Sequence, residues 1–392
     1  MSAESRMLPE TEQLFRQAVR GVAEVRTGQR GLTLHRLPEW TAMYHDNDAL
    51  TQKVADQASG ARLELLTSAT HLTLTYKSTR DANTDGSWVS PPTTVTLTGA
   101  GAGAGEPISI SHDDGSLRLW NGDVHVRTTA GQDSVAEFEL PPAEAPRALQ
   151  LWLPHSCAIE LIDLTANAPL AAAPNHQPKW VHYGSSISHG SEATEPIGVW
   201  PVVAARQLGL DLFSLGLAGS ANIEIFAAQV IAAQPADLIT LKLGINTVNG
   251  NHLSRRVFIP AVHSFLDVIR AAHPTTPIVV ISPIFCPPHE HNPGPTLGGL
   301  GGKATSQPDR DEAWAGNLNL TMIRDILANI VERRNDPNLG HMNGLAIFGP
   351  EDSQLMPDDL HPDSAGQTLM GNRAAEQLKL LLPKLFPVAN TL

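Results

Sequence analysis

The spacing of apolar and polar residues changes character along the chain. In its first half, apolar side chains alternate with polar ones, most plainly at Leu72, Leu74 and Tyr76, each followed by a polar residue. A period of two predicts β-strands with one buried face. The segments expected to form such strands are 61–78, 93–99, 117–127, 135–140 and 148–153.

Short runs rich in Gly, Asp, Asn and Ser separate these segments, for example at 81–87 and 121–123. Turn residues at such spacings are typical of β-sandwiches. We therefore interpret residues 30–170 as an antiparallel β-sandwich, jelly-roll-like and similar to carbohydrate-binding modules. Residues 10–25 carry apolar side chains at helical spacing and predict a short amphipathic helix before it.

After residues 164–179, which are rich in Ala, Pro and Asn, the pattern changes. Continuous apolar runs now alternate with stretches of helical spacing, which favours a parallel sheet covered by helices on both faces. The predicted strands are 180–185, 212–216, 238–244 and 278–282. The fold class is therefore α/β, with an N-terminal domain at 1–173 and a three-layer α/β/α domain at 178–392.

Three segments of the C-terminal domain interrupt or end this alternation. A loop rich in Gly and Pro occupies residues 287–303, and such long loops are uncommon unless they are functional. Residues 345–349 resemble a further strand. Residues 364–386 have the spacing of a closing helix.

Composition excludes several classes of protein. With 42% apolar residues the chain is not wholly disordered, and 27 Lys and Arg against 40 Asp and Glu give a net charge of −13. Nucleic acid and anionic membranes both attract concentrated positive charge, so neither is expected as a partner. No signal-peptide core and no run long enough to span a bilayer is present, which predicts a soluble, cytoplasmic protein. Cys157 and Cys286 indicate neither a disulfide framework nor a metal site.

Reactive side chains follow the predicted strands, where the active sites of open α/β sheets lie. Ser186 follows Gly184 and Ser185, and a hydroxyl on such a tight turn can act as a nucleophile. A serine-rich helix cap is the structural alternative. Near the C-terminus, Asp358 stands three residues before His361, a spacing at which a carboxylate can orient a general base. Taken alone, this His could equally be structural. Asp359 is the alternative to Asp358 as the carboxylate that orients it.

Two further turns could supply hydrogen-bond donors. Small residues around Gly219 allow backbone N–H groups to approach a substrate oxygen, although a simple connection between strand and helix would have the same composition. Asn246, after the strand at 238–244, can donate its side-chain amide to an oxyanion. Asn also tolerates turn geometry, so the residue type alone does not distinguish an oxyanion donor from a structural turn residue.

The order of these four blocks along residues 178–390 resembles the SGNH (GDSL) hydrolase superfamily. The resemblance implies that Ser186 is the nucleophile, His361 the base and Asp358 the residue that orients it. It also implies an oxyanion hole formed by the N–H of Ser186, Gly219 and Asn246. These roles agree with acyl transfer through an acyl-serine. The expected catalysis needs no metal and no cofactor, although an acyl-CoA can serve as co-substrate.

Two positions differ from the usual pattern of the family, and they restrict the resemblance to a subgroup of it. Ser185 stands where the family usually has Asp before the nucleophile, and Thr247 where many members have Asp after the oxyanion Asn. The pattern is similar to a Gly-Ser-Ser-Ile subgroup whose members carry an N-terminal β-sandwich. That subgroup includes a salicylyl acyltransferase that tailors a tetracycline-type polyketide, and this chain resembles it in layout and length.

This resemblance implies an O-acyltransferase that moves an acyl group, salicylyl or another aryl group among the candidates, from a CoA thioester to a hydroxyl of a small natural product. An esterase or deacetylase would use the same triad, with water as acceptor. The expected partners are thus a small ester or acyl-thioester and a hydroxylated acceptor, with the oligomeric state open. A carbohydrate-binding protein with an inactive hydrolase domain is a more remote alternative.

Other features indicate structure rather than chemistry. Trp200 and Pro201 are expected to begin a helix, with Trp200 in the core. Cys286 is interpreted as a packed thiol beside a candidate acyl pocket at Phe285. His289 and His291, on either side of Glu290, have the composition of a metal site, but the SGNH mechanism uses none.

Overall fold

The computed structural model describes residues 7–99, 105–298, 302–306 and 316–385. They form two compact units. The first contains the chain up to His176 together with residues 194–197, and the second contains Gln177–Ala193 and the chain from Gly198 onward. The fold class is the one expected from the sequence, with a sheet-rich N-terminal unit and an α/β C-terminal unit.

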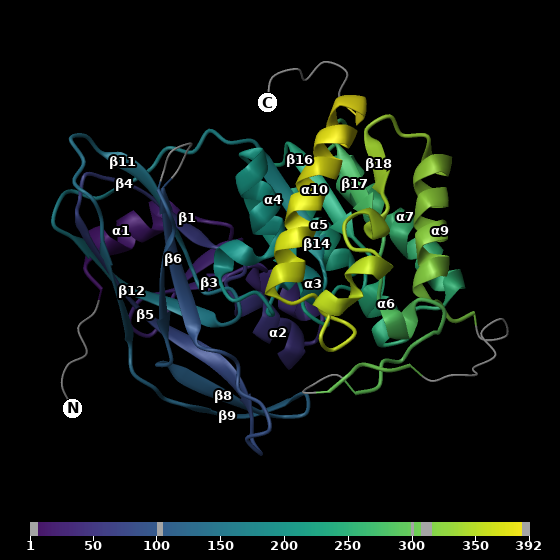
Figure 1. Ribbon diagram of the computed structural model, residues 1–392, viewed down its shortest axis with the longest axis horizontal. Helices are drawn as coiled ribbons and strands as arrows, with labels where there is room; N and C mark the ends of the chain where they lie inside the picture. Colours follow the sequence, from purple (N-terminus) through teal and green to yellow (C-terminus); the bar gives the residue numbers. More distant parts are fainter. Residues whose placement is uncertain (1–6, 100–104, 299–301, 307–315, 386–392) are drawn as a thin grey trace. The chain divides into compact units, whose positions relative to one another are not determined.

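The N-terminal unit consists of two sheets and three short helical segments (Figure 1). In the first sheet the strand order is β1 (Val19–Arg20), β4 (Arg62–Thr67), β11 (Arg147–Trp152), β6 (Thr93–Gly99) and β7 (Ile108–His112), and β13 (Ala171–Ala172) pairs with β4. In the second the order is β2 (Glu24–Thr27), β3 (Leu32–His35), β12 (Ala158–Ala166), β5 (His71–Asn83), β8 (Ser116–Asn121) and β9 (Val124–Thr129), and β10 (Ser134–Glu139) pairs with β5. The helical segments are α1 (Pro9–Ala18), η1 (Glu39–Tyr44) and α2 (Ala49–Asp56).

The two sheets enclose one hydrophobic core, which makes this unit a sandwich. Leu63 and Leu151 contribute to the core from the first sheet, and Leu74 and Leu161 from the second. Phe15 of α1 packs into the same core and is fully buried. The alternation of the sequence therefore predicted the buried face of the strands correctly.

Two details of the sandwich differ from the sequence expectation. The helix that was expected over residues 10–25 ends at Ala18, and the chain continues directly into β1. Among the described strands of the sandwich, β5 and β8 run parallel, whereas every other pair is antiparallel. Alternation reports which side chains are buried but not the direction of the neighbouring strand.

The C-terminal unit has a five-stranded parallel sheet. The strand order is β15 (Asp211–Gly216), β14 (Lys179–Gly184), β16 (Leu238–Lys242), β17 (Ile278–Ile281) and β18 (Leu339–Met342). Among the described residues, its helices of four residues or more are α3 (Ser186–His189), α4 (Trp200–Leu208), α5 (Ile225–Ala233), α6 (Ile245–Asn249), α7 (Arg255–Ala272), α9 (Leu320–Arg334) and α10 (Ser364–Leu385). Short 3₁₀ segments lie at 287–289, 344–346 and 350–355. A further one, at 196–198, includes residues 196 and 197 of the N-terminal unit.

Helices cover both faces of this sheet. Neighbouring residues of a strand point to opposite faces, and on β14 the ring of His182 contacts Trp200 of α4 while that of Tyr183 contacts Phe265 of α7. Helices α4 and α10 pack together on the first face, and α5 and α7 pack together on the other (Figure 1). The unit is therefore the three-layer α/β/α fold that was expected.

One other expectation for this unit is wrong. Residues 345–349 do not form a strand, because β18 ends at Met342 and a 3₁₀ turn follows at 344–346. Two apolar side chains of this segment are buried, since Ile347 and Phe348 are 0% exposed, and this burial explains why its pattern resembled a strand. The closing helix is described to Leu385, and residue 386 lies outside the described residues. Trp200 begins α4 and is buried, as expected.

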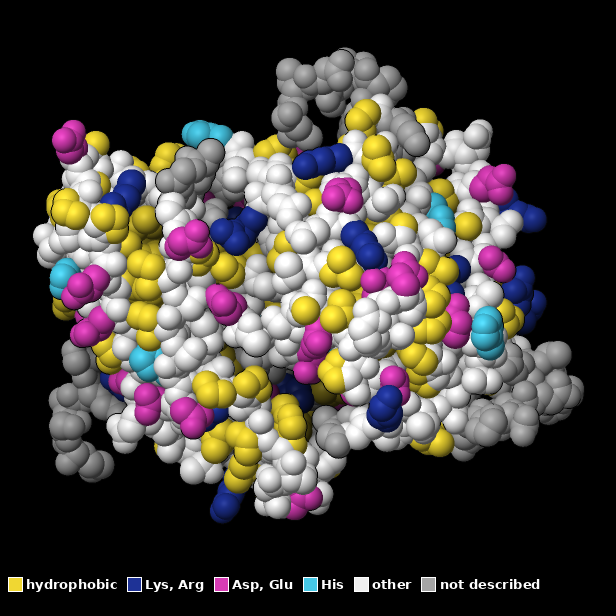
Figure 2. Space-filling model, in the orientation of Figure 1, with side chains coloured by type: hydrophobic (Ala, Val, Ile, Leu, Met, Phe, Trp, Pro, Cys, Tyr) yellow, Lys and Arg dark blue, Asp and Glu magenta, His cyan; other side chains and the backbone are white. Residues whose placement is uncertain are grey.

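The surface carries charge of both signs. On the face shown in Figure 2, Lys and Arg side chains are scattered among Asp and Glu and do not form a continuous basic patch. In the part of the chain that the structure describes, no helix is both long enough and apolar enough to cross a membrane.

Candidate active site

Three side chains from distant parts of the sequence form one hydrogen-bonded chain. His361 Nε2 lies 2.9 Å from Ser186 Oγ, and His361 Nδ1 lies 2.7 Å from Asp358 Oδ2. The other carboxylate oxygen, Asp358 Oδ1, accepts from the backbone N–H groups of Leu360 (2.9 Å) and His361 (2.6 Å). A hydroxyl that contacts an imidazole, itself oriented by a carboxylate, is the arrangement that activates a serine.

The local backbone explains how Ser186 reaches this position. β14 ends at Gly184, and α3 begins only two residues later, at Ser186. A Cβ at Gly184 would lie 2.2 Å from Ser188 Oγ, so only glycine permits this turn. Because Ser186 is the first residue of α3, its N–H has no acceptor within the helix. Ser186 is also more exposed than its neighbours in this turn, which are buried.

Asp358 is an ionised partner for His361. Burial alone would raise the pKa of the Asp358 carboxyl, but its hydrogen bond and charge interaction with His361, together with the two backbone donors, lower the pKa below its ordinary value. The rival carboxylate points elsewhere, because Asp359 Oδ2 pairs with Lys303 Nζ at 2.8 Å. Asp358 therefore contacts the imidazole, and Asp359 has its own partner.

The two remaining predicted residues lie on the turns that follow neighbouring strands. Gly219 follows β15, is exposed and has a φ of +72°, a left-handed conformation that favours glycine. Asn246 lies in α6 after β16 and is 4% exposed. Asn246 Oδ1 accepts from the N–H of Ala221 at 3.1 Å, so the amide nitrogen Nδ2 is the donor that remains. The parallel strands β15, β14 and β16 are adjacent, so these turns and Ser186 follow the same edge of the sheet.

A second Ser–His pair lies nearby but is not accessible. His182 Nε2 is 2.8 Å from Ser188 Oγ, and both residues are 0% exposed. Burial, followed by the charge of Lys242, lowers the pKa of His182 to about 3. A neutral, fully buried imidazole with no exposed hydroxyl beside it packs the core and does not meet substrate.

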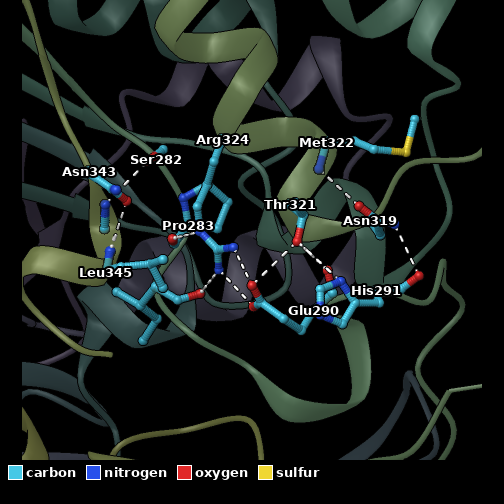
Figure 3. Close-up of polar contacts among 12 residues, drawn as sticks. Ser282, Pro283, Glu290, His291, Asn319, Thr321, Met322, Arg324, Asn343 and Leu345 are labelled. Atoms are coloured by element: carbon cyan, nitrogen blue, oxygen red, sulfur yellow. Dashed lines mark hydrogen bonds and ion pairs between the residues drawn. The ribbon is translucent and has the colours of Figure 1, made fainter. Parts of the chain in front are cut away.

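The loop after β17 is anchored by a network that the sequence did not reveal (Figure 3). Arg324 of α9 donates to both carboxylate oxygens of Glu290, at 2.5 and 2.8 Å, and to the backbone carbonyls of Pro283 and Ile284. Thr321 donates to the backbone carbonyl of Glu290 at 2.8 Å. The loop expected at 287–303 is thus attached to α9 at Glu290, and its residues 299–301 lie outside the described residues.

The side chains of Glu290 and His289 have partners within the protein. Both oxygens of Glu290 are engaged by Arg324, and His289 Nε2 bonds to Thr296 Oγ1 at 2.7 Å. Within the described residues no group of three or more His, Cys, Asp or Glu side chains is placed to hold a metal ion. Cys286 is buried, and burial raises the pKa of its thiol to about 12, which keeps it protonated.

Lys242, at the end of β16, is an unexpected buried base. Its side chain is 2% exposed. Burial, with a smaller contribution from Arg324, lowers the pKa of Lys242 to about 7. The signal was visible as a single Lys inside an apolar strand.

We expect Lys242→Met to stabilise the protein, and more at pH 6 than at pH 9. Between about pH 7 and 10.5 the unfolded chain holds a proton that the native amine has lost, so wild-type stability should rise with pH in this window and the advantage of Met should shrink. Below pH 7, a pKa lowered from 10.5 to about 7 corresponds to a loss of roughly 5 kcal/mol in the free energy of unfolding of the wild-type protein. Urea unfolding at pH 6, 7.5 and 9 measures this difference. Lys379→Met, at an exposed position of α10, is the control; an equal gain at all three pH values for Lys242→Met would contradict the expectation.

Comparisons with known proteins give one family match and several matches of fold. Residues 182–369 match the model of the GDSL-like lipase/acylhydrolase family. No curated protein sequence matches the chain. Among solved structures, the chain is similar to a salicylyl acyltransferase, SsfX3, from a tetracycline biosynthetic pathway, with 24% identity, a TM-score of 0.75 and coverage of 93% of this chain and 94% of that one.

Two further solved structures share the fold over nearly the whole chain. A putative GDSL-like lipase from Bacteroides ovatus has 18% identity and a TM-score of 0.65, covering 95% of this chain and 96% of its own. A family two carbohydrate esterase from Clostridium thermocellum, in complex with cellohexaose, has 15% identity and a TM-score of 0.57, covering 93% and 99%. Residues 182–369 of this chain are therefore similar to the GDSL-like lipase/acylhydrolase family, and the chain shares the fold of these three solved structures.

Proposed function

We propose that the protein transfers an acyl group through an acyl-Ser186 intermediate, from a CoA thioester to a hydroxyl of a small natural product. The observation that carries the proposal is the continuous chain from Ser186 Oγ through His361 to Asp358. The whole-chain likeness to a salicylyl acyltransferase supports transfer, with an aryl acyl group as the first candidate. The cytoplasmic location expected from the sequence is part of this proposal.

In the first half-reaction, His361 takes the proton of Ser186 as Oγ attacks the thioester carbonyl. The oxyanion that develops accepts hydrogen bonds from the N–H of Ser186, the N–H of Gly219 and the side-chain amide of Asn246. The C–S bond then breaks and the CoA thiolate is released from the acyl group. At this point the proton is still on His361. Asp358 orients the imidazole and stabilises its charged form.

In the second half-reaction, His361 first gives that proton to the departing thiolate and is neutral again. The acceptor hydroxyl then gives its proton to His361 and attacks the acyl-serine. Collapse releases the new ester and returns the proton to Ser186. The triad treats water and an alcohol alike, so the outcome depends on how well the site excludes water and binds the acceptor.

An esterase is the second candidate function. The similarity to family two carbohydrate esterases favours it, because their fold extends over most of this chain. A carbohydrate-binding protein with an inactive hydrolase domain is the least supported alternative, since the Ser–His–Asp chain is complete.

Competition between acceptors separates the first two functions. We expect that, when an acyl-CoA or a nitrophenyl ester is supplied with rising concentrations of a phenolic or polyol acceptor, mass spectrometry will detect an acylated acceptor that increases at the expense of free acid. The rate of thiol or nitrophenol release should stay constant if acyl-enzyme formation limits turnover. Free acid as the sole product at every acceptor concentration would show a hydrolase instead. Ser186→Ala is the control for uncatalysed transfer.

A further inference from the structure

The turn that carries Gly219 is held by side chains as well as by its own backbone. Three consecutive backbone N–H groups donate to side-chain oxygens: Ala221 to Asn246 Oδ1 at 3.1 Å, Asn222 to Glu224 Oε1 at 2.8 Å, and Ile223 to Tyr183 Oη at 3.1 Å. Two of these acceptors come from other elements, since Tyr183 belongs to β14 and Asn246 to α6. The conformation of the turn is thus stabilised in part by side chains of β14 and α6.

The turn also contains strained backbone. Ile223 has a φ of +66°, which is rare for a β-branched residue, and such strain costs of the order of 1–3 kcal/mol. Strained positions persist where the surroundings over-determine them. Here the hydrogen bond from its N–H to Tyr183 and the burial of its side chain, which is 6% exposed, hold Ile223 in place.

Tyr183 and Glu224 are directly paired. Tyr183 Oη donates to Glu224 Oε2 at 2.8 Å, and it accepts from Ile223 at the same time. Burial, followed by the charge of Glu224, raises the pKa of Tyr183, so the phenol keeps the proton that it donates. The ring is fully buried and lies 5.2 Å from the ring of Phe265, which fixes the position of the hydroxyl.

This pair joins two parts of the candidate site. Tyr183 precedes Ser186 by three residues on β14, whereas Glu224 follows the turn of Gly219 after β15. We propose that Tyr183 and Glu224 are positioning residues, which hold the turn at 217–223 in place relative to Ser186 and Asn246 so that the N–H of Gly219 can donate to the developing oxyanion. The inference deepens the proposed function and rests on it.

Tyr183→Phe tests the proposal by removing a single oxygen atom. The variant leaves the N–H of Ile223 and one oxygen of Glu224 without their partner, so the turn should relax. We expect kcat for a short-chain nitrophenyl ester to fall about 10–100-fold with little change in KM, because a displaced donor weakens transition-state binding more than substrate binding. Affinity for a phosphonate or boronic acid inhibitor that mimics the tetrahedral state should fall by a similar factor.

Tyr76→Phe is the matched control. Tyr76 is also 0% exposed, and its phenol bonds to the side chain of Thr93 at 3.1 Å, but it lies in the core of the sandwich. It should lose comparable stability and keep wild-type kcat. If Tyr183→Phe behaves like Tyr76→Phe in kcat and inhibitor affinity, the proposal is wrong.

A double-mutant cycle with Asn246→Ala adds a second readout. Asn246→Ala alone should lower kcat about 10²–10³-fold, as for other single oxyanion donors. If Tyr183 acts through the same turn, the combined loss should be clearly smaller than the product of the two single losses. Independent, multiplicative effects would contradict a shared turn.

Glu224 provides the test if Tyr183→Phe does not fold. Glu224→Gln keeps an acceptor for the N–H of Asn222 and should retain most activity, whereas Glu224→Ala should reproduce the loss of kcat. Equal, near-wild-type kcat for both would overturn the proposal. Ser186→Ala in the same assay separates the two hypotheses: retained turnover there would reject the proposed function itself, whereas its loss combined with unaffected Tyr183 and Glu224 variants would reject only the positioning role.

Discussion

Replacement of Ser186 by alanine should lower kcat for a nitrophenyl ester by about 10⁵–10⁶-fold. The expected size follows from the geometry, because Ser186 Oγ is the group that His361 Nε2 contacts, and Asp358 orients that imidazole. His361→Ala should lose a similar factor. The double variant should lose little more, because the residues of a triad act as one unit.

Ser185→Ala is the matched control for this experiment. Ser185 is adjacent to the nucleophile and buried, and its hydroxyl has no hydrogen-bond partner among the residues that the structure describes. Removing a buried hydroxyl that is already unpaired should cost little stability and less than a few-fold in kcat.

Stopped-flow or burst kinetics should also show no acyl-enzyme in Ser186→Ala. Wild-type-like turnover in Ser186→Ala would reject Ser186 as the nucleophile.

The second large effect separates two adjacent carboxylates. Asp358→Asn should lower kcat about 10⁴-fold, because an amide at this position favours the wrong tautomer of His361 and no longer stabilises the imidazolium. Asp359→Asn should change kcat by less than about three-fold, since Asp359 pairs with Lys303, which is 70% exposed, and exposed ion pairs contribute at most about 1 kcal/mol.

The Asn substitution is a fair comparison at both positions. Asp359 has a φ of +61°, and Asn tolerates this left-handed conformation as well as Asp does. Parallel measurement of kcat and of the melting temperature for the two variants distinguishes catalytic from structural loss. A larger loss of kcat from Asp359→Asn would reverse the assignment.

Much of this architecture could be predicted from the sequence because burial leaves a periodic signature. The alternation around Leu72 and Leu74 identified the inner face of the sandwich, and continuous apolar runs such as 278–282 identified the parallel sheet. The candidate triad could be predicted because Asp358 and His361 are close in sequence and Ser186 follows a strand. Short-range spacing of this kind can be recognised in the sequence without knowledge of the tertiary fold.

The rest depends on contacts between segments that are distant in sequence. Nothing near Tyr183 indicates that its hydroxyl lies against Ile223, forty residues away, or that Arg324 contacts Glu290, thirty-four residues away. The parallel pairing of β5 with β8 is of the same kind. Lys242 is the exception, because a Lys within a mostly apolar run is visible in the sequence without knowledge of the fold.

The separation of Ser186 from its base has a consequence for synthesis in the cell. The two residues are 175 positions apart, so the nucleophile emerges from the ribosome long before the imidazole that would activate it. At about 5–20 residues per second, this interval lasts roughly 9–35 s. During that time the nascent chain carries an unactivated serine and cannot acylate itself or its surroundings. Esterase activity is therefore a direct reporter that the segment carrying Asp358 and His361 has docked, and it can be used to time the completion of this domain.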